Sequence, residues 1–315
     1  MQATAIAHPN IALIKYWGKR DLPLNLPAVP SLSITLDTFT TTTTVQWGAE
    51  QDLVIVNGVE QVGRASERVV RFLDLFGEDR PPCVVRSTNN FPTAAGLASS
   101  ASGFAALALA ADRASGSHRG KQALSVLARQ GSGSACRSLW GGWVLWPRGE
   151  RPDGLDSHGT PLFGPDHWDV RVVLGLVSDA KKPIGSTAGM IRTQQRSPLY
   201  PGWVDSAADD IRDAHDAIDR RDLEALGVAM ERSTLKMHAT MISVGIRYWK
   251  PETVAVMEQV EQLRASGVGA WYTMDAGPNV KILCEAKDAQ VVADALAAIG
   301  ARTQILGVGG DARLA

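Results

Sequence analysis

Two lysines and a tyrosine follow an apolar run near the start of the chain, within NIALIKYWGK at residues 10–19. If residues 11–15 form a strand, Lys15 lies on the same face as apolar side chains of that strand and can project from a buried sheet into a cleft. An ammonium group in that position needs an anion. Tyr16 and Lys19 can add a hydroxyl and a second charge to the same pocket. The competing interpretation is that both lysines are solvated at a strand end.

A loop of small residues, PTAAGLASSA at residues 92–101, leads into an Ala-rich segment that favours a helix. Small side chains around Gly96 let an anion approach the unpaired N–H groups of a first helical turn, where the helix dipole adds partial positive charge. The hydroxyls of Ser99 and Ser100 can bind phosphate oxygens or offer a hard ligand to Mg²⁺. The Walker A pattern is absent because no Gly-Lys-Ser/Thr follows. Composition alone fits a triphosphate site and a capped core helix about equally well.

A second turn rich in glycine and hydroxyl residues, GSGSACRS at residues 131–138, carries an arginine. A guanidinium group binds a carboxylate or a phosphate through two parallel N–H bonds, and Arg137 can do so here. Ser132 and Ser134 can donate to the remaining oxygens of the same anion. The turn could instead be a Ser/Gly loop with one surface arginine. Cys136 has no base partner in the sequence and is interpreted as a packing residue.

An aspartate precedes a Gly-Pro turn in YTMDAGPNVKIL, residues 272–283. The strand-like approach places Asp275 at a strand end, where a rigid element can aim it into a cleft. A carboxylate there can orient a hydroxyl and accept its proton during phosphoryl transfer. An aspartate before a turn is also a common turn-forming residue. His215 and His238 show no metal-ligand spacing and are interpreted as packing or surface residues.

The overall composition, 45% hydrophobic and 21% charged over 315 residues, is typical of a globular protein. Lys and Arg number 32 against 33 Asp and Glu, so nothing suggests a nucleic-acid surface, and an anionic ligand must be bound locally. The three cysteines are far apart and predict reduced thiols rather than disulfides or a metal site. The N-terminal segment is too polar for a signal peptide, and no run approaches the ~20 apolar residues of a membrane span. The sequence therefore predicts a cytoplasmic protein with no membrane partner.

Strands and helices must position these motifs together. Strands are predicted within 31–47, 53–60, 83–87, 140–146, 169–177, 270–273, 279–284 and 303–308, and helices at 66–76, after Gly96, and near 203–219, 222–237 and 251–266. The polar, Gly/Pro-rich stretch 148–166 is predicted to be a loop or a domain junction. The pattern predicts an α+β fold in which a β-rich N-terminal region and a helix-rich C-terminal region share one cleft, with domains at 1–165 and 166–315.

Five motifs resemble, in the same order along the chain, those of the diphosphomevalonate decarboxylase family. This family belongs to the small-molecule kinase superfamily that includes galactokinase, homoserine kinase, mevalonate kinase and phosphomevalonate kinase. The motifs are NIALIKYWGKRDLPLNLP, NNFPTAAGLASSASGFAALA, GSGSACRSLWGGWVLW, IGSTAGM at 184–190 and YTMDAGPNVKIL. The resemblance implies the superfamily fold, ATP and Mg²⁺ as cofactors, a small phosphorylated substrate, and a homodimer.

The resemblance also implies roles for individual residues. Lys15 lies by the reacting carbon and carboxylate, Arg137 pairs with the carboxylate, and Asp275 is the catalytic aspartate. The substrate-binding residues that it implies are Tyr16, Lys19, Asn25, Ser132, Ser134, Arg137 and Ser186. The nucleotide-binding residues are Pro92, Gly96, Leu97, Ala98, Ser99 and Ser100, with Ser100 also the candidate Mg²⁺ ligand.

The implied reaction is the ATP-dependent decarboxylation of mevalonate 5-diphosphate to isopentenyl diphosphate, through phosphorylation of the 3-hydroxyl. The segment HATMISVGIRYWKP, residues 238–251, begins like the family and then departs from its proline-rich continuation. Because that segment is implied to line the substrate side, a phosphomevalonate decarboxylase or a mevalonate 3-kinase is the alternative. A catalytically silent member that binds a ligand is another. Retention of Lys15, Arg137 and Asp275 together favours an active enzyme.

Overall fold

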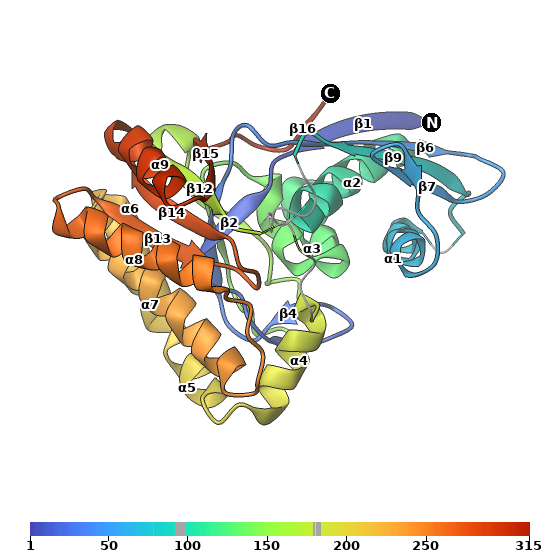
Figure 1. Cartoon of the computed structure of the whole chain (residues 1–315). Helices are drawn as coiled ribbons and strands as arrows, with labels where there is room; N and C mark the ends of the chain where they lie inside the picture. The colour runs from blue at the N-terminus through green and yellow to red at the C-terminus, as the bar shows by residue number, and fades with distance from the viewer. Residues whose placement is uncertain (78, 92–98, 179, 181–183) are drawn as a thin grey trace.

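The computed structural model describes residues 1–77, 79–91, 99–178, 180 and 184–315. A six-stranded sheet organises the N-terminal part of the chain, in the order β16-β1-β6-β9-β7-β8 (Figure 1). Its strands are β1 (Gln2–Ala7), β6 (Thr41–Trp47), β7 (Leu53–Val56), β8 (Val59–Glu60), β9 (Cys83–Asn89) and β16 (Arg313–Leu314). Because β16 pairs antiparallel with β1, the last residues of the chain complete the first sheet.

The Ala-rich helix α2 (Ser99–Ser115) packs across strands β1 and β6 of this sheet. Its alanines are buried in one cluster with apolar residues of the sheet, and their small side chains let the helix approach closely. Helix α3 (Lys121–Gly131) and the 3-10 helix η2 (Gly133–Leu139) pack against α2. Helix α1 (Arg64–Leu73) continues into the short 3-10 helix η1 (Asp74–Phe76).

A four-stranded sheet at the centre of the molecule has the order β11-β10-β5-β2. Its strands are β2 (Asn10–Ile14), β5 (Ser31–Thr35), β10 (Trp143–Trp146) and β11 (Thr160–Phe163). Every residue of β2 is buried, and its register with β5 shifts between Ala12 and Ile14. Strand β2 therefore ends within the core, and Lys15 follows directly. The small hairpin of β3 (Lys19–Asp21) and β4 (Leu26–Pro27) comes next.

The C-terminal part is a four-stranded antiparallel sheet, β13-β14-β12-β15, between two layers of helices (Figure 1). Its strands are β12 (Val170–Leu176), β13 (Ala270–Met274), β14 (Val280–Glu285) and β15 (Arg302–Leu306). Helices α8 (Pro251–Ala265) and α9 (Ala289–Ala298) cover one face, and α6 (Ala207–Arg220) and α7 (Leu223–Ile242) cover the other. The remaining elements are α4 (Ser186–Arg196), α5 (Tyr200–Asp205), η3 (Pro165–His167) and η4 (Ala286–Asp288).

The predicted α+β class is confirmed, and the Asn57-Gly58 turn joins β7 to β8 with positive φ at both residues, as that dipeptide favours. The prediction of an unstructured 148–166 was partly wrong, because β11 lies within it and pairs with β10. Proline and glycine in this stretch hid a short edge strand. One apolar cluster joins residues of β2 and β5 to residues of β12, α6 and α7, so the two regions share a core. The domain division at residue 165 stays a prediction.

Gly18 allows the chain to turn sharply between β2 and β3. Its φ is +101°, and a Cβ built at this position would overlap the hydroxyl of the buried Tyr200. We expect Gly18→Ala to lower the free energy of unfolding in urea by about 2–4 kcal/mol, the sum of backbone strain and overpacking. Gly58→Ala is the matched control, because Gly58 also has positive φ (+79°) but nothing lies within 4 Å of its built Cβ. Equal losses of unfolding free energy in the two variants would show that the overlap with Tyr200 does not destabilise the protein.

Candidate active site

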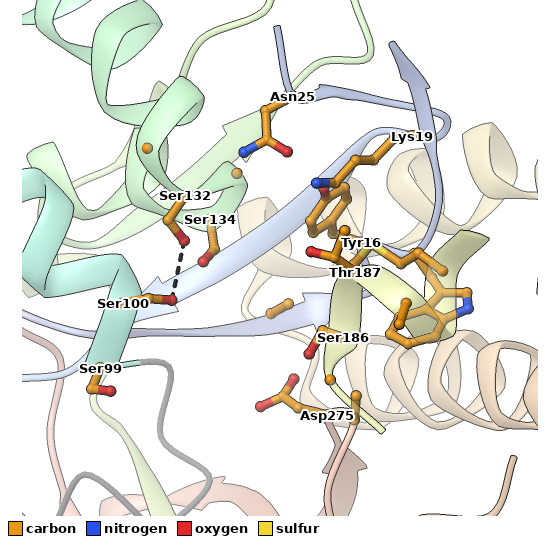
Figure 2. Close-up of a pocket in the computed structure, with 18 of the residues that line it drawn as sticks. Tyr16, Lys19, Asn25, Ser99, Ser100, Ser132, Ser134, Ser186, Thr187 and Asp275 are labelled. Atoms are coloured by element: carbon orange, nitrogen blue, oxygen red, sulfur yellow. Dashed lines mark hydrogen bonds between the residues drawn. The ribbon is translucent and has the colours of Figure 1, made fainter. Parts of the chain in front are cut away.

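A cavity of about 1070 Å³ is lined by residues of β2, β3, α1, α2, η2 and α4 and of the turn that follows β13. Such a volume holds a ligand of drug size or slightly larger. Every predicted site residue that falls within the described ranges lines it: Lys15, Tyr16, Lys19, Asn25, Ser99, Ser100, Ser132, Ser134, Arg137, Ser186 and Asp275. In Figure 2 the four serines 99, 100, 132 and 134 lie on one side of the cavity, and Ser186 and Asp275 lie on the other. Pro92, Gly96, Leu97 and Ala98 lie outside the described residues.

Helix α7 holds the two chain segments that carry the charged centre of the site. The Ser233 hydroxyl accepts a hydrogen bond from the backbone N–H of Lys15 at 3.0 Å. The hydroxyl of the next residue, Thr234, donates to the Met274 carbonyl at 2.8 Å and accepts from the Met274 N–H at 3.1 Å. The end of β2 and the end of β13 are thereby fixed to one rigid element, which sets the position of Asp275.

The Asp275 carboxylate lies between two lysine ammonium groups. Lys15 Nζ is 2.8 Å from Asp275 Oδ1, and Lys281 Nζ is 3.0 Å from Asp275 Oδ2. Lys15 Nζ also donates to the Ala12 carbonyl at 2.8 Å. Both lysine side chains are almost fully buried, whereas the Asp275 side chain is 31% exposed and faces the cavity. The arrangement is a fixed carboxylate at the pocket wall with cations behind it.

These contacts shift the titration of the two predicted catalytic groups. Burial lowers the pKa of Lys15 to about 8, against the opposing attraction of Asp275. Burial alone would raise the pKa of Asp275, but the charges of Lys15 and Lys281 outweigh it and hold that pKa below its ordinary value. Asp275 is therefore ionised throughout the physiological pH range, and Lys15 begins to lose its proton near pH 8.

Arg137 lies in the wall of the cavity and is held by other side chains. Its Nε and Nη2 donate to the Asn10 side-chain oxygen at 3.2 and 3.1 Å, and its Nη1 donates to the Ser31 hydroxyl. Its guanidinium lies 5.6 Å from the Trp146 ring centroid, a cation–π distance. These bonds use three of the five guanidinium N–H donors, so the group is rigid and its charge is directed at the pocket from a buried position.

Tyr16 places a hydroxyl that needs a partner beside the cavity. Its ring packs on Trp146 with centroids 4.7 Å apart, and its buried hydroxyl makes no hydrogen bond to the part of the chain that is described. Burial raises the pKa of Tyr16, so the hydroxyl keeps its proton and remains a donor. Lys19 adds a cation nearby, and its pKa is lowered by burial and by Arg68. The Asn25 amide donates to the Arg129 carbonyl at 2.8 Å, which fixes the wall of this subsite.

The opposite side of the cavity is built from the start of α2 and the start of η2. Ser100 Oγ and Ser132 Oγ are 3.1 Å apart, which ties the two elements together (Figure 2). The Ser134 carbonyl accepts from the Asn10 side-chain amide at 3.1 Å. The start of α2 and the start of η2 therefore lie side by side on one wall of the cavity.

The donor set fits a magnesium nucleotide. The first N–H groups of α2 suit phosphate oxygens, and the hydroxyl oxygens of Ser99 and Ser100 suit both phosphate and Mg²⁺. Among the described residues, no group of three or more His, Cys, Asp and Glu could hold a metal by itself. A magnesium ion here would share its ligands with phosphate oxygens and water, as Mg²⁺ does in nucleotide sites.

The sequence analysis missed several lining residues, among them Asn10, Arg68 and Arg71, and it also missed Lys281, which pairs with Asp275. Arg68 and Arg71 lie three residues apart on α1, a spacing that puts them on one face. Arg68 donates to the Gly131 carbonyl at 3.1 and 2.7 Å, beside the serines of the clamp. Lys281 could have been found in the sequence, because a lysine inside the apolar run NVKILC predicts a buried cation that needs a partner.

Two histidines and three cysteines take no part in the lining of the cavity. His238 is buried behind Lys15, its ring lies 5.0 Å from that of Trp249, and burial lowers its pKa to about 3, so it is neutral at physiological pH. His215 is exposed beside Asp216. All three cysteines are free and buried. None of the helices in the described ranges is long and apolar enough to cross a membrane.

Models of two protein families match the chain. The diphosphomevalonate decarboxylase-like N-terminal domain matches residues 7–159, and the mevalonate 5-diphosphate decarboxylase C-terminal domain matches residues 172–306. A diphosphomevalonate decarboxylase of Aspergillus fumigatus is 39% identical over 95% of this chain and 80% of its own length. The diphosphomevalonate decarboxylase of Homo sapiens is 38% identical over 89% of this chain and 76% of its own length.

Solved structures agree with the sequence matches. Mevalonate diphosphate decarboxylase from Staphylococcus aureus superposes with a TM-score of 0.95 at 36% identity, covering 100% of this chain and 98% of that one. The enzyme from Enterococcus faecalis gives a TM-score of 0.92 at 37% identity, with coverage of 100% and 99%. A structure described as MDDEF in complex with MVAPP, AMPPCP and magnesium gives 0.94 at 38% identity, with coverage of 100% and 99%. With both halves matched in order and the predicted site residues gathered in one cavity, the chain belongs to the diphosphomevalonate decarboxylase family.

Proposed function

We propose that this chain catalyses the ATP-dependent decarboxylation of mevalonate 5-diphosphate, giving isopentenyl diphosphate, ADP, phosphate and carbon dioxide. The observation that carries the proposal is the Lys15–Asp275 pair, 2.8 Å apart, on the wall of a cavity whose other side holds Ser99 and Ser100 at the start of α2. A site for simple ligand binding has no need of a doubly paired carboxylate across the cavity from such a helix start.

The first step is proposed to use Asp275 to orient the substrate's 3-hydroxyl. ATP with Mg²⁺, when bound, supplies the phosphoryl group that turns this tertiary hydroxyl into a leaving group. Asp275 has a pKa below its ordinary value, so its carboxylate is always ionised but is a weak proton acceptor. Its main contribution is therefore positioning of the hydroxyl, together with negative charge near the reacting carbon.

The second step expels phosphate and carbon dioxide. As the C–O bond to the phosphorylated oxygen breaks, positive charge develops on the tertiary carbon, and the electrons of the breaking C–C bond to the carboxylate form the alkene. Asp275 tolerates that positive charge. Lys15, at the end of a fully buried strand, and Arg137, held by Asn10 and Ser31, are positioned to hold the carboxylate and the departing phosphate. Rigid placement of these charges supplies electrostatic stabilisation without reorganisation.

The 5-diphosphate is proposed to bind between Tyr16, Lys19 and the clamp at Ser132 and Ser134. Among the described residues, the Tyr16 hydroxyl has no hydrogen-bond partner and the Lys19 ammonium is partly buried, and a second phosphate could accept hydrogen bonds from both. Arg68 brings a further cation to the same region. This excess of donors supports a diphosphate over a single phosphate.

Comparison of kcat/KM for mevalonate, its 5-phosphate and its 5-diphosphate tests the proposed function directly, with ADP and carbon dioxide release measured together. The terminal phosphate adds charge-assisted bonds worth about 1.5–3 kcal/mol each, so we expect the diphosphate to exceed the monophosphate by roughly tenfold or more. Lys19→Ala should reduce that preference. Lys121→Ala, which removes an exposed lysine paired with Asp311, is the control and should keep it. A higher kcat/KM for the monophosphate would overturn the substrate assignment.

The divergent segment 238–251 was expected to line the substrate side, and the structure corrects this. None of its residues, all of which are described, lines the cavity. The segment instead contacts the chain that leads into α4: the Tyr248 hydroxyl donates to the Ile184 carbonyl at 2.9 Å, and α4 begins at Ser186. The position of this segment therefore does not favour mevalonate 5-phosphate or mevalonate over the 5-diphosphate as the substrate.

Two further features belong to the proposal. The resemblance predicts a homodimer, and the three free, buried cysteines fit a cytoplasmic location. Neither feature enters the chemistry above.

A further inference from the structure

Lys281 is a second cation on the Asp275 carboxylate. Its Nζ lies 3.0 Å from Asp275 Oδ2, and its side chain is 2% exposed. Lys15 approaches the other carboxylate oxygen from the end of β2, whereas Lys281 approaches from β14. The two lysines thus reach one carboxylate from different sheets, and only one of them was expected from the sequence.

The alternation of strand β14 explains where Lys281 points. Its neighbours Val280, Ile282 and Cys284 pack in the cluster formed with α8 and α9. Lys281 therefore faces the opposite side of the sheet, toward α7 and the end of β2. The cross-strand partner of Lys281 is Thr273, two residues before Asp275, so lysine and aspartate lie on one face. A buried ammonium is costly unless it is paired, and Asp275 supplies the pairing.

Among the described residues, the charged or titratable groups that face Asp275 come from several elements. Lys15 comes from the end of β2, Lys281 from β14 and Arg137 from η2. His238 comes from α7 and is neutral above a pKa of about 3. Three cations therefore surround one carboxylate, and the pocket carries an excess of positive charge before any substrate arrives.

We propose that Lys281 is a positioning residue that keeps the Asp275 carboxylate directed into the pocket, so that Lys15 can bind the substrate carboxylate without releasing Asp275. The proposal rests on the proposed function. The Lys15 ammonium has three N–H donors, of which two bond the Ala12 carbonyl and Asp275. When a substrate carboxylate competes for this ammonium, the bond from Lys281 retains Asp275 in place.

The pH dependence of the enzyme separates this role from simple packing. The positive charge of Lys281 lowers the pKa of Asp275 by attraction and the pKa of Lys15 by repulsion. Lys281→Met removes this one charge from both neighbours. Both pKa values must therefore rise in Lys281→Met. The alkaline limb of kcat/KM, near pH 8 in the wild type, should therefore move upward in Lys281→Met. A packing defect that leaves the charges around Lys15 unchanged would not move this limb.

The experiment compares wild type, Lys281→Met, Lys281→Arg and Lys287→Met. We expect Lys281→Met to lose about 10- to 100-fold in kcat, the size of a charge-assisted bond, with the KM for ATP little changed. Lys281→Arg keeps a cation and should keep the alkaline limb near the wild-type position, even if Lys281→Met does not fold. Lys287→Met removes an exposed lysine that pairs with Glu285 and should behave as wild type. An unmoved alkaline limb in Lys281→Met, or an alkaline limb that moves upward in Lys281→Arg, would overturn the proposal.

A readout without turnover keeps the proposal distinct from the proposed function. Titration of the Asp275 carboxyl by carbon-13 NMR should give a higher pKa in Lys281→Met than in wild type, whatever substrate the enzyme uses. If wild-type protein turns over no mevalonate phosphate but this difference is found, the proposed function fails and the pairing stands. An unchanged Asp275 titration overturns the pairing alone.

Discussion

Asp275→Asn is expected to lower kcat by roughly 10²- to 10⁴-fold, the range that positioned acid–base groups contribute. The change removes the negative charge that lies 2.8 Å from Lys15 and 3.0 Å from Lys281 but keeps the shape of the side chain. The hydroxyl loses its orienting acceptor, and the developing positive charge loses its counter-charge. Single-turnover measurement of ADP and carbon dioxide release shows whether both steps slow together.

The same substitution leaves two buried ammonium groups without their carboxylate. Breaking a buried pair by removing one partner costs about 3–5 kcal/mol, so Asp275→Asn should also unfold at lower urea concentration. Asp153→Asn, which removes an exposed carboxylate paired with Arg151, is the control and should change neither turnover nor stability appreciably. Kinetics must be measured where the variant is folded, by near-UV circular dichroism. A folded Asp275→Asn protein with nearly normal kcat would remove Asp275 from the mechanism.

Lys15→Met is expected to lower kcat/KM by roughly 30-fold to several thousand-fold. Truncating one partner of a buried, hydrogen-bonded charge pair costs about 2–5 kcal/mol, and 1.4 kcal/mol is a factor of ten. Lys281 still holds Asp275 in this variant, so the loss should fall on substrate binding and decarboxylation rather than on ATP affinity. Calorimetry with ATP and steady-state kinetics with the mevalonate phosphates measure the two separately. Equal losses for both ligands would indicate a general defect instead.

The wild-type pH profile carries the same information about Lys15. Burial lowers its pKa to about 8, so the ammonium form declines as pH rises through 8, and kcat/KM should fall there. Bound substrate brings negative charge next to Lys15 and raises its pKa, so the corresponding limb of kcat should lie at higher pH. Coincident limbs for kcat and kcat/KM would mean that Lys15 does not contact the bound substrate.

The sequence determined which residues could do chemistry and how each is presented locally. An apolar run ending in Lys15 predicts a buried strand with a cation at its end, and an Ala-rich segment after Ser99 predicts a helix start that suits phosphate. Asp275 before a Gly-Pro turn predicts a carboxylate at a strand end, where β13 places it. The strand, the helix and the strand end are found where they were expected because strand alternation, helix propensity and turn chemistry act over a few residues.

Only the tertiary structure decided which of these groups meet. Lys15 and Asp275 are 260 positions apart in the chain and touch because Ser233 and Thr234 of α7 bind the backbone beside each of them. Tertiary packing also produces three other features of the site. These are the hydrogen bonds of Arg137 to Asn10 and Ser31, the arginines of α1 that line the cavity, and the second lysine on Asp275. Such contacts depend on how separate sheets pack through shared apolar clusters, which no local pattern encodes.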